Sequence, residues 1–298
     1  MKWVLGILVG SLCLTTVFFS TAWADAGNAY PNGIEGIKAA STPPPGYYYR
    51  MYAVFYNADT LTDNDGKELD LDFDLSLFVN AHRFLWVSNH KILGADYAAD
   101  IALTLMNVDL EIGKAGVDAS TFGVGDIFVE PLILAWHGAC YDAAFGAGFF
   151  IPTGKYEEDD PASPGSDMWT GMFSMGGTAY FDAAKTLSAS ILSRYEFHGE
   201  QNDTEVTPGN DFHFEWGVGK TIKEVWEAGM AGYCQWQVTD DSGPGTDDVK
   251  DSVYAFGPEV NLMIPSQKMV VSFRGLTEFG AEDRTEGYLI VLALTKIL

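Results

Sequence analysis

Cysteine is scarce in this chain of 298 residues, which contains only Cys13, Cys140 and Cys234. So few cysteines exclude a disulfide-stapled scaffold, and neither they nor the histidines show the spacing of a zinc site. Basic residues are also few, with 17 lysines and arginines against 41 aspartates and glutamates. We therefore expect no nucleic-acid partner, because a net charge of −24 repels phosphate and such binding needs basic patches.

Long apolar runs are missing beyond the amino terminus, where no segment reaches the roughly eighteen apolar residues of a membrane-spanning helix. The amino terminus itself has Lys2, an apolar run over 4–19 and then Ala22-Trp23-Ala24. This order predicts a signal peptide over residues 1–24 that is cleaved after export, whereas an uncleaved anchor would have a longer run. Cleavage would remove one lysine and leave 16 basic against 41 acidic residues, a net charge of −25.

Apolar and polar side chains alternate instead, most regularly between residues 69 and 79. A period of two predicts a strand, because a helix would scatter the aspartates of this stretch around its axis. The alternation alone leaves two interpretations open: leucines that face a soluble core, or leucines that face lipid around a water-filled lumen. In the membrane interpretation we expect lumen positions for Asp70, Asp72 and Asp74, and lipid positions for Leu71, Phe73, Leu75 and Leu77.

Strand-like runs recur along the chain, and the connections between them alternate between long and short. Connections such as 153–168 and 240–249 are long and polar, whereas 89–90 and 183–184 are short. Transmembrane barrels have long outer loops and short periplasmic turns, and a soluble sandwich has no reason to sort its loops in this way. The sequence therefore predicts an all-β fold, an antiparallel transmembrane up-and-down β-barrel of about twelve strands over residues 46–298. The expected strands are 46–58, 68–88, 91–112, 124–137, 139–152, 169–182, 185–199, 210–221, 225–239, 250–264, 267–280 and 285–298.

Many of these runs have one apolar face and one face of small or polar residues. In 211–218, for example, acidic and histidine side chains alternate with aromatic ones. A polar interior accounts for this pattern, and closure of the sheet leaves no unpaired edge in the membrane. The runs 91–112 and 124–137 alternate poorly, so their faces are not assigned. The residues expected to line the lumen and a substrate path are Arg50, Asp70, Asp72, Asp74, Arg194, Glu196, His198, His213, Glu215, Tyr233, Gln235, Gln237, Arg274 and Glu278.

Several motifs also carry a family resemblance that runs from about residue 33 to the end of the chain. In this order they resemble the outer-membrane proteins associated with the meta-cleavage pathway of phenol degradation. The motifs are Gly33-Ile-Glu-Gly-Ile-Lys-Ala-Ala, Pro43-Pro44-Pro45-Gly46-Tyr47, Ile92-Leu-Gly-Ala-Asp-Tyr97, Gly125-Asp126-Ile127 through Trp136-His137-Gly138, Pro152-Thr153-Gly154-Lys155-Tyr156, and Gly232-Tyr233 through Gln237-Val-Thr-Asp-Asp-Ser-Gly243.

The resemblance implies a barrel in the outer membrane of a Gram-negative bacterium that helps small hydrophobic, often aromatic, compounds to enter. Its expected partners are outer-membrane lipid, these solutes and the barrel-assembly machinery. One feature departs from the usual pattern, since outer-membrane strands commonly end in an aromatic residue and this chain ends Lys296-Ile297-Leu298. The terminal assembly signal is weakened accordingly.

Catalytic and metal sites are the competing interpretations of the polar residues. Histidines 82, 90, 137, 198 and 213 lie on different runs, and neither a Gly-x-Ser-x-Gly nor a His-Glu-x-x-His motif occurs. We therefore expect no catalytic residues, no metal and no cofactor. The acidic runs 157–160 and 239–248 are suited in charge to calcium, but they lack EF-hand spacing and are interpreted as solvated loops.

The function predicted from these patterns is a passive channel for small hydrophobic or aromatic compounds, which would meet inward aromatics such as Tyr233 on their way through. A structural or adhesive surface barrel and, more remotely, an outer-membrane hydrolase remain as alternatives. Residues 25–45 precede the first strand and end in three prolines, which cannot donate to a ladder. Two interpretations of this segment stay open: a loose periplasmic tail, or a plug within a lumen that twelve strands make only modestly wide.

Overall fold

A computed structural model describes residues 28–246 and 248–298 of the chain. The predicted signal peptide over 1–24 lies outside these residues. Within them, the only helical elements are two short 3-10 turns, η1 (Gly113–Ala115) and η2 (Pro265–Gln267). None of the helices in the described part of the chain is long and apolar enough to cross a membrane.

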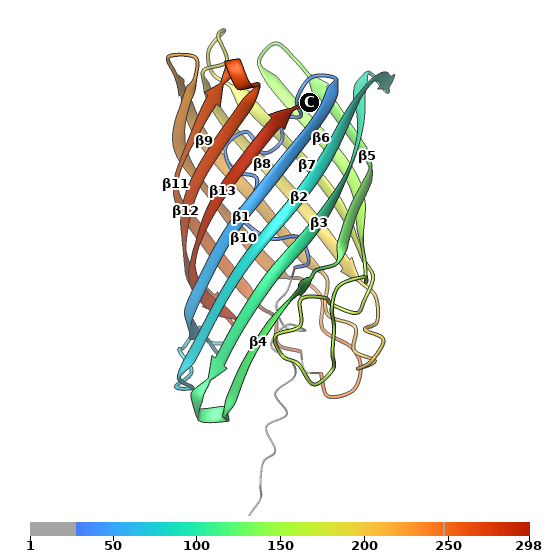
Figure 1. The fold of residues 1–298 in the computed structure, drawn as a ribbon, viewed down its shortest axis with the longest axis vertical. Coiled ribbons are helices and arrows are strands. Elements are labelled where there is room, and N and C mark those ends of the chain that lie inside the picture. Colours follow the sequence, from blue (N-terminus) through green and yellow to red (C-terminus); the bar gives the residue numbers. More distant parts are fainter. Residues whose placement is uncertain (1–27, 247) are drawn as a thin grey trace, which may run out of the picture.

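Thirteen antiparallel strands in the described residues form one closed barrel (Figure 1). Closure comes from the pairing of the first strand with the last, which joins Tyr48 to Ile297 and continues to Leu61 and Thr285. The strands are β1 (Gly46–Leu61), β2 (Phe73–Ile92), β3 (Ala95–Ile112), β4 (Val117–Val124), β5 (Ile127–His137), β6 (Tyr141–Ile151), β7 (Thr170–Tyr180), β8 (Leu187–His198), β9 (Asp211–Ile222), β10 (Trp226–Gln237), β11 (Ser252–Ile264), β12 (Met269–Glu282) and β13 (Thr285–Ile297).

Thirteen strands fill twelve positions of the wall, because β4 and β5 share one neighbour. β4 pairs with the half of β3 from Leu105 to Ile112, and β5 pairs with the half from Asp96 to Ala102. The barrel is therefore twelve-stranded, as the sequence predicts. The prediction that 113–123 is a connection is wrong, because most of it belongs to β4, which extends the wall beyond the other strands at the lower end in Figure 1.

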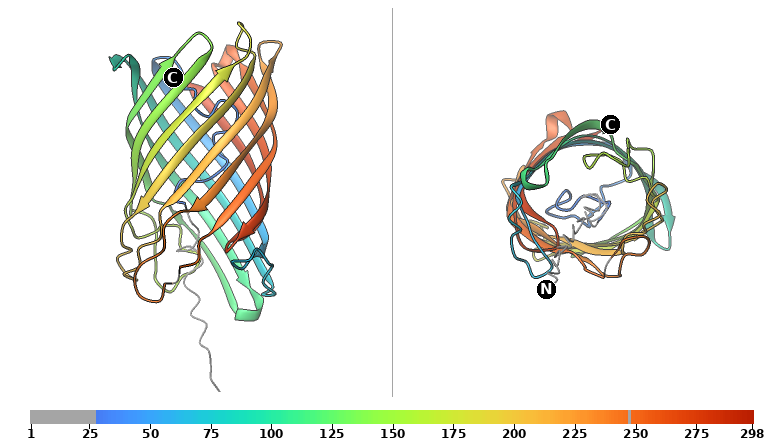
Figure 2. Two further views of the ribbon diagram at one scale, coloured as in Figure 1. Left: turned by 180° about the vertical axis from the view of Figure 1, so that it is seen from behind. Right: turned by 90° about the horizontal axis from the view of Figure 1, so that it is seen from below.

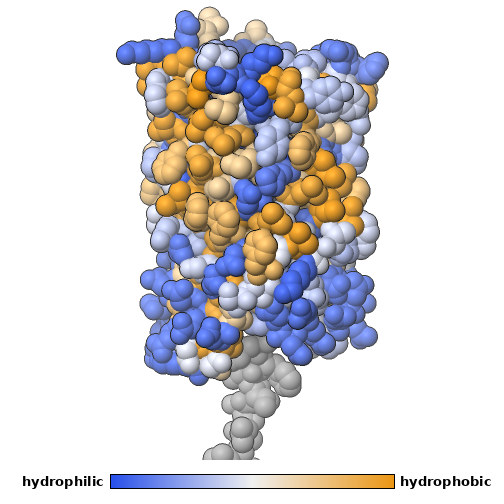
Figure 3. Space-filling model, viewed as in Figure 1, coloured by the Kyte–Doolittle hydropathy of each residue, from blue (hydrophilic) through white to orange (hydrophobic). Residues whose placement is uncertain are grey.

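Long and short connections lie at opposite ends of the barrel. The long ones, including 62–72, 152–169, 199–210 and 238–251, gather at one end together with the tips of β3 and β4 (Figures 1 and 2). The space-filling view shows a broad apolar band across the visible face of the wall and a polar zone over the long connections (Figure 3). Outward side chains such as Phe84, Phe173 and Phe256 are about half exposed and belong to the apolar surface. This surface is the one a barrel presents to lipid.

An irregular segment over residues 28–45 lies inside the barrel. It runs along the lumen toward the short-turn end, where it joins β1, and the end-on view shows it within the ring of strands (Figure 2). Its side chains Tyr30, Ile34, Ile37 and Ala40 are buried. Gly33 and Gly36 have φ values of +75° and +74°, a region that favours glycine, and they let the segment bend within the lumen.

The structure corrects the face assignment of residues 69–77. Phe73 is buried, and Leu71, Leu75 and Leu77 line an internal cavity with it. Asp70 and Asp72 lie in the connection before β2, and Asp74 is exposed on the outer side of the strand. The apolar face points inward because the lumen is apolar along the first half of β2, and the aspartates lie in or next to a long connection, where water solvates them. These three aspartates are therefore not lumen residues.

Candidate functional site

A cavity of about 460 Å³ lies between the internal segment and one side of the wall. It extends to the long-loop end, since Leu69 and Asp283 of the connections also line it. Its wall comes mainly from alternate positions of four adjacent strands, because residues two apart on a strand share a face. The aliphatic and aromatic lining includes Val54 of β1, Phe73, Leu75, Leu77 and Val79 of β2, Met106, Leu110 and Ile112 of β3, and Leu289 of β13.

An aromatic cluster lines the cavity where the internal segment meets β5 and β6. Tyr30 of the internal segment packs edge-on against Phe128 and Phe150, with ring centroids 5.4 and 6.5 Å away. The guanidinium of Arg194 lies 3.9 Å from the centre of the Tyr30 ring, which is a cation–π contact. The Tyr30 hydroxyl donates to Glu35 at 2.6 Å. One tyrosine of the segment therefore packs against both the wall and the charged side chains of the lumen, and this part of the lining is called the floor of the cavity.

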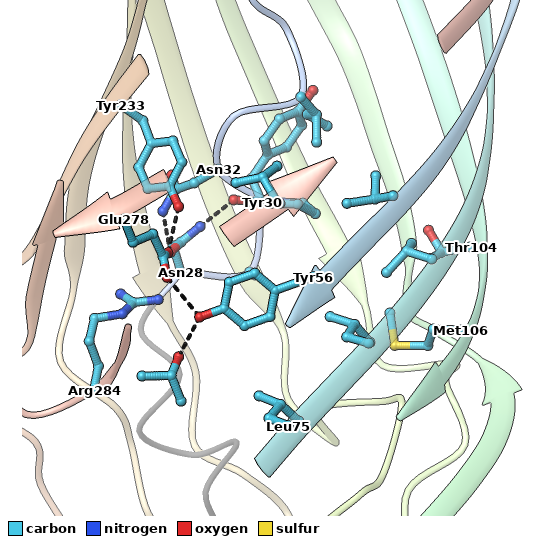
Figure 4. A pocket seen from close by; sticks show the side chains of 18 of the residues that line it. Asn28, Tyr30, Asn32, Tyr56, Leu75, Thr104, Met106, Tyr233, Glu278 and Arg284 are labelled. Carbon is cyan, nitrogen blue, oxygen red and sulfur yellow. Dashed lines mark hydrogen bonds between the residues drawn. The ribbon is translucent and has the colours of Figure 1, made fainter. Parts of the chain in front are cut away.

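A cluster of polar side chains lines the cavity near the long connections (Figure 4). The carboxylate of Glu278 accepts hydrogen bonds from the Tyr56 hydroxyl at 2.8 Å and from the Tyr233 hydroxyl at 2.5 Å. The side chain of Arg284 lies beside them and pairs with Asp251 at 3.1 Å. Burial raises the pKa of Asp251 to about 6, although Arg284 acts to lower it. The cavity is thus apolar over most of its surface, with hydroxyl groups and charge gathered at one end.

Carboxylates on the far wall hold the backbone of the internal segment. Glu196 accepts hydrogen bonds from the amides of Ala29 at 2.6 Å and Tyr30 at 3.1 Å. Glu215 accepts from the amide of Glu35 at 2.9 Å, and Glu259 accepts from the amide of Ile37 at the same distance. These glutamates lie on β8, β9 and β11, so the segment is anchored along its length. Buried amides need such partners, because the segment makes no ladder with the wall.

Arginines link the same carboxylates to the segment. Arg194 pairs with Glu215 at 2.9 Å, and Arg274 pairs with Glu259 at 2.8 Å and also donates to the carbonyl of Gly33. A side chain at Gly36 would overlap with both the guanidinium of Arg274 and the carboxylate of Glu259. Glycine at this position therefore allows the backbone to approach the ion pair closely.

Two of the five histidines, His198 and His213, belong to a buried hydrogen-bonded belt near the long-loop end. His198 lies between the Thr170 hydroxyl at 2.9 Å and Asp211 at 3.0 Å, and His213 contacts Glu196 at 2.8 Å. A hydroxyl, a histidine and an aspartate in a row resemble the parts of a hydrolase triad. Thr170, however, is only 1% exposed, so its hydroxyl has no open space for a substrate. The belt is better explained as a buried polar network that stabilises the interior of the barrel.

The structure brings most of the sequence-predicted lumen residues to the interior, but it divides them between two environments. Tyr233 and Glu278 line the cavity. Gln237 lies at the rim, where its amide donates to Asp241 at 2.8 Å. The others lie within the buried network that surrounds the internal segment, namely Arg50, Arg194, Glu196, His198, His213, Glu215, Gln235 and Arg274.

Sequence reasoning missed the residues that make the cavity apolar and those that close it. Met106, Leu110 and Ile112 lie on a run whose apolar residues change from the outer to the inner face along the strand, so alternation over the whole run did not assign them. Tyr30 and Glu35 lie in a segment without any periodicity. The sequence signal for this segment is local: Gly33 and Gly36 lie close to Tyr30, Ile34 and Ile37, ahead of the three prolines at 43–45. In the described residues no group of three or more potential metal ligands is arranged to hold an ion.

The fold and its apolar outer band define the class of protein, an outer-membrane β-barrel. A sequence model of the family described as "Putative MetA-pathway of phenol degradation" matches residues 58–294. The chain belongs to this family, as the motifs suggested. No curated protein matches the sequence.

Several solved structures are similar to this chain. An outer-membrane channel from Pseudomonas putida F1 is similar over 91% of this chain and 100% of its own, with a TM-score of 0.78 and 14% identity. The beta domain of the Bordetella autotransporter BrkA matches 85% of this chain and 99% of its own, with a TM-score of 0.48 and 10% identity. The translocator domain of NalP from Neisseria meningitidis covers 86% and 90%, with a TM-score of 0.49 and 8% identity. At these identities the similarity concerns the fold alone.

Proposed function

We propose that this protein is a passive outer-membrane channel that admits small hydrophobic or aromatic compounds. The observation that carries the proposal is the cavity, which is apolar over most of its lining and reaches the long-loop end of a closed barrel. Its volume is about 460 Å³. An apolar cavity of about 150 Å³ already accommodates benzene, so this one has room for a monocyclic compound with substituents.

The internal segment would act as the gate of this channel. Compounds would enter from the long-loop end, occupy the cavity and pass on only when the floor at Tyr30 moves. No energy coupling is involved, since the solute would move down its own concentration gradient. The lumen residues that hold the segment would then control opening, whereas the cavity residues would select the solute.

Its proposed location is the outer membrane of a Gram-negative bacterium, reached by export through a cleaved signal peptide and insertion by the barrel-assembly machinery. The outer band of aromatic and aliphatic side chains supports a lipid environment (Figure 3). The similar channel from Pseudomonas putida F1 supports the same location. An enzymatic role gains no support from the buried Thr170 and His198 pair.

Liposome swelling tests the proposal directly. Vesicles with the intact protein and vesicles with a variant that lacks residues 26–42 are each diluted into solutions of small aromatic compounds. We expect slow swelling with the intact protein and faster swelling with the deletion, because the deletion removes the part of the segment that holds Tyr30.

Two controls make the result decisive. A heat-modifiable shift on gels must show that both barrels are folded, and a large polysaccharide must cause no swelling. Swelling that stays at the level of empty vesicles for both folded proteins would contradict the channel, and loop-dependent surface binding in its place would favour an adhesive barrel.

A further inference from the structure

Few charged side chains line the cavity, and they differ in whether their hydrogen-bond partners are charged or neutral. Among the described residues, the lining contains four: Arg83, Glu278, Asp283 and Arg284. Any charged solute in the cavity must interact with these groups, because the remaining lining is neutral. Whether the two arginines are free to bind an anion therefore decides which solutes the cavity accepts.

Both arginines are already engaged with carboxylates. Arg83 donates to Asp100 at 2.6 Å and pairs with Glu35 at 2.7 Å and with Glu130 at 3.4 Å. Three carboxylates around one guanidinium leave no surplus positive charge for a ligand. Arg284 pairs with Asp251 at 3.1 Å and also donates to the side-chain oxygen of Gln235.

Glu278 differs from the arginines because its hydrogen-bond donors are neutral. They are the hydroxyl groups of Tyr56 and Tyr233 and the backbone amide of Gly287, at 2.8, 2.5 and 2.8 Å. Neutral donors satisfy the oxygens of a carboxylate but leave its charge in place. The polar end of the cavity is therefore negative in character.

The approach to the cavity is negative as well. The connections at the long-loop end carry many more aspartates and glutamates than lysines. Charges of one sign around an opening lower the local concentration of ions of that sign. The acidic residues there include Asp63, Asp65, Glu68, Asp70, Glu157, Glu158, Asp159, Asp160, Asp203, Glu205, Asp240 and Asp248.

We infer that the cavity selects uncharged aromatic compounds and excludes the corresponding carboxylates. This inference rests on the proposed function and names its substrate class more closely. An uncharged ring gains contacts with the aliphatic wall and can exchange hydrogen bonds with the polar end. A carboxylate loses its hydration, finds both arginines neutralised and lies near Glu278, and an unpaired buried charge of this kind is costly.

Benzamide and benzoate provide a matched pair for the test, because they share size and planar shape and differ in charge. The full protein in lipid nanodiscs is dialysed to equilibrium at neutral pH against each labelled compound, and binding to empty nanodiscs is subtracted. We expect benzamide to bind about 100-fold more tightly than benzoate, since each factor of ten requires only about 1.4 kcal/mol.

Three substitutions then test whether these charges cause the selection. Thr104→Lys adds a cation to the cavity lining, and Asn107→Lys adds the same charge to the outer side of the same strand. We expect benzoate binding to strengthen at least about tenfold in Thr104→Lys, and to remain weak in Asn107→Lys. Glu278→Gln removes the negative group and should shift binding in the same direction, which keeps the test available if the lysine variant does not fold.

The possible outcomes separate the inference from the proposed function. Equal binding of benzamide and benzoate would overturn the charge selection and leave the channel proposal standing. Binding of neither compound would overturn the proposed use of the cavity, and the inference with it. If benzamide binds selectively but benzoate binding stays unchanged in every folded variant, these charges are not the cause and the inference fails.

Discussion

Replacing Tyr30 tests whether the docked segment closes the lumen. The Tyr30 ring is 5% exposed, contacts two phenylalanines and lies 3.9 Å beneath the Arg194 guanidinium. Truncation of a buried aromatic residue to alanine costs about 3–5 kcal/mol, to which a desolvated cation–π contact contributes about 2. If the docked segment loses this free energy, the undocked population should rise by a factor of roughly 100 to 4,000.

Planar bilayer recordings measure this change. We expect Tyr30→Ala to open often, in steps that the intact protein shows rarely. Tyr30→Phe keeps the ring contacts and removes the hydroxyl, which donates to Glu35 at 2.6 Å and accepts from Arg83 at 3.3 Å, so it should fall between the two, at a cost of about 1–3 kcal/mol. Tyr47→Ala is the matched control, because Tyr47 is 62% exposed at the start of β1 and should leave the conductance unchanged.

Limited proteolysis supplies the second measurement, since an undocked segment becomes accessible to protease while the barrel stays intact. The reasoning would be refuted if Tyr30→Ala were folded and cleaved readily in the segment, yet conducted no more than the intact protein. Release of the segment would then be shown without opening, and another part of the chain would have to block the lumen.

Three further predictions concern the wall and its turns. Phe84→Arg should cost about 2–4 kcal/mol in denaturant titrations of the barrel in lipid vesicles, because Phe84 faces lipid; a smaller cost than for an arginine in the long connections would contradict this. Hydrogen bonds from Thr186 lower the pKa of Asp182 from 3.8 to about 2, so its carboxylate stabilises the fold above pH 4 and this contribution is lost as the pH falls toward 2. Asp182→Asn should therefore flatten the pH dependence of the unfolding midpoint in that range. A water-soluble maleimide should label the exposed Cys140 and not the lipid-facing Cys234, as mass spectrometry of the folded protein would show; equal labelling would place Cys234 wrongly.

The sequence predicts the wall well, since every predicted run contains a strand and the number of wall positions is correct. Alternation identifies two faces of a strand, but it does not say which face is inside. On β9, the polar residues Asp211, His213 and Glu215 point inward, and the expected orientation is found. On β2 the same assumption, that polar side chains face inward, gives the wrong face, because Phe73, Leu75 and Leu77 face an apolar lumen.

The candidate site is less predictable for a related physical reason. The cavity exists only where β2 and β3 leave space beside the internal segment, and that space is a property of the assembled barrel. Alternation on β3 is hidden because Ile101 and Leu103 face lipid while Leu110 and Ile112 face the cavity. The amide of Tyr30 donates to Glu196, which lies 166 positions further along the chain, so no local sequence pattern predicts this contact.

The enclosed segment also has a consequence for how the protein folds. Its backbone reaches carboxylates and an arginine that lie 166 to 241 residues further along the chain. Contacts between residues so far apart in the sequence make folding slow. The entropy of closing the long loop between the partners is lost before the contacts form and stabilise the fold. The segment continues directly into β1, and β1 forms the seam with β13. Zippering of this seam before the segment has entered would trap an empty lumen, with buried glutamates that lack their amide partners. We therefore expect residues 28–45 to enter the lumen before β1 pairs with β13.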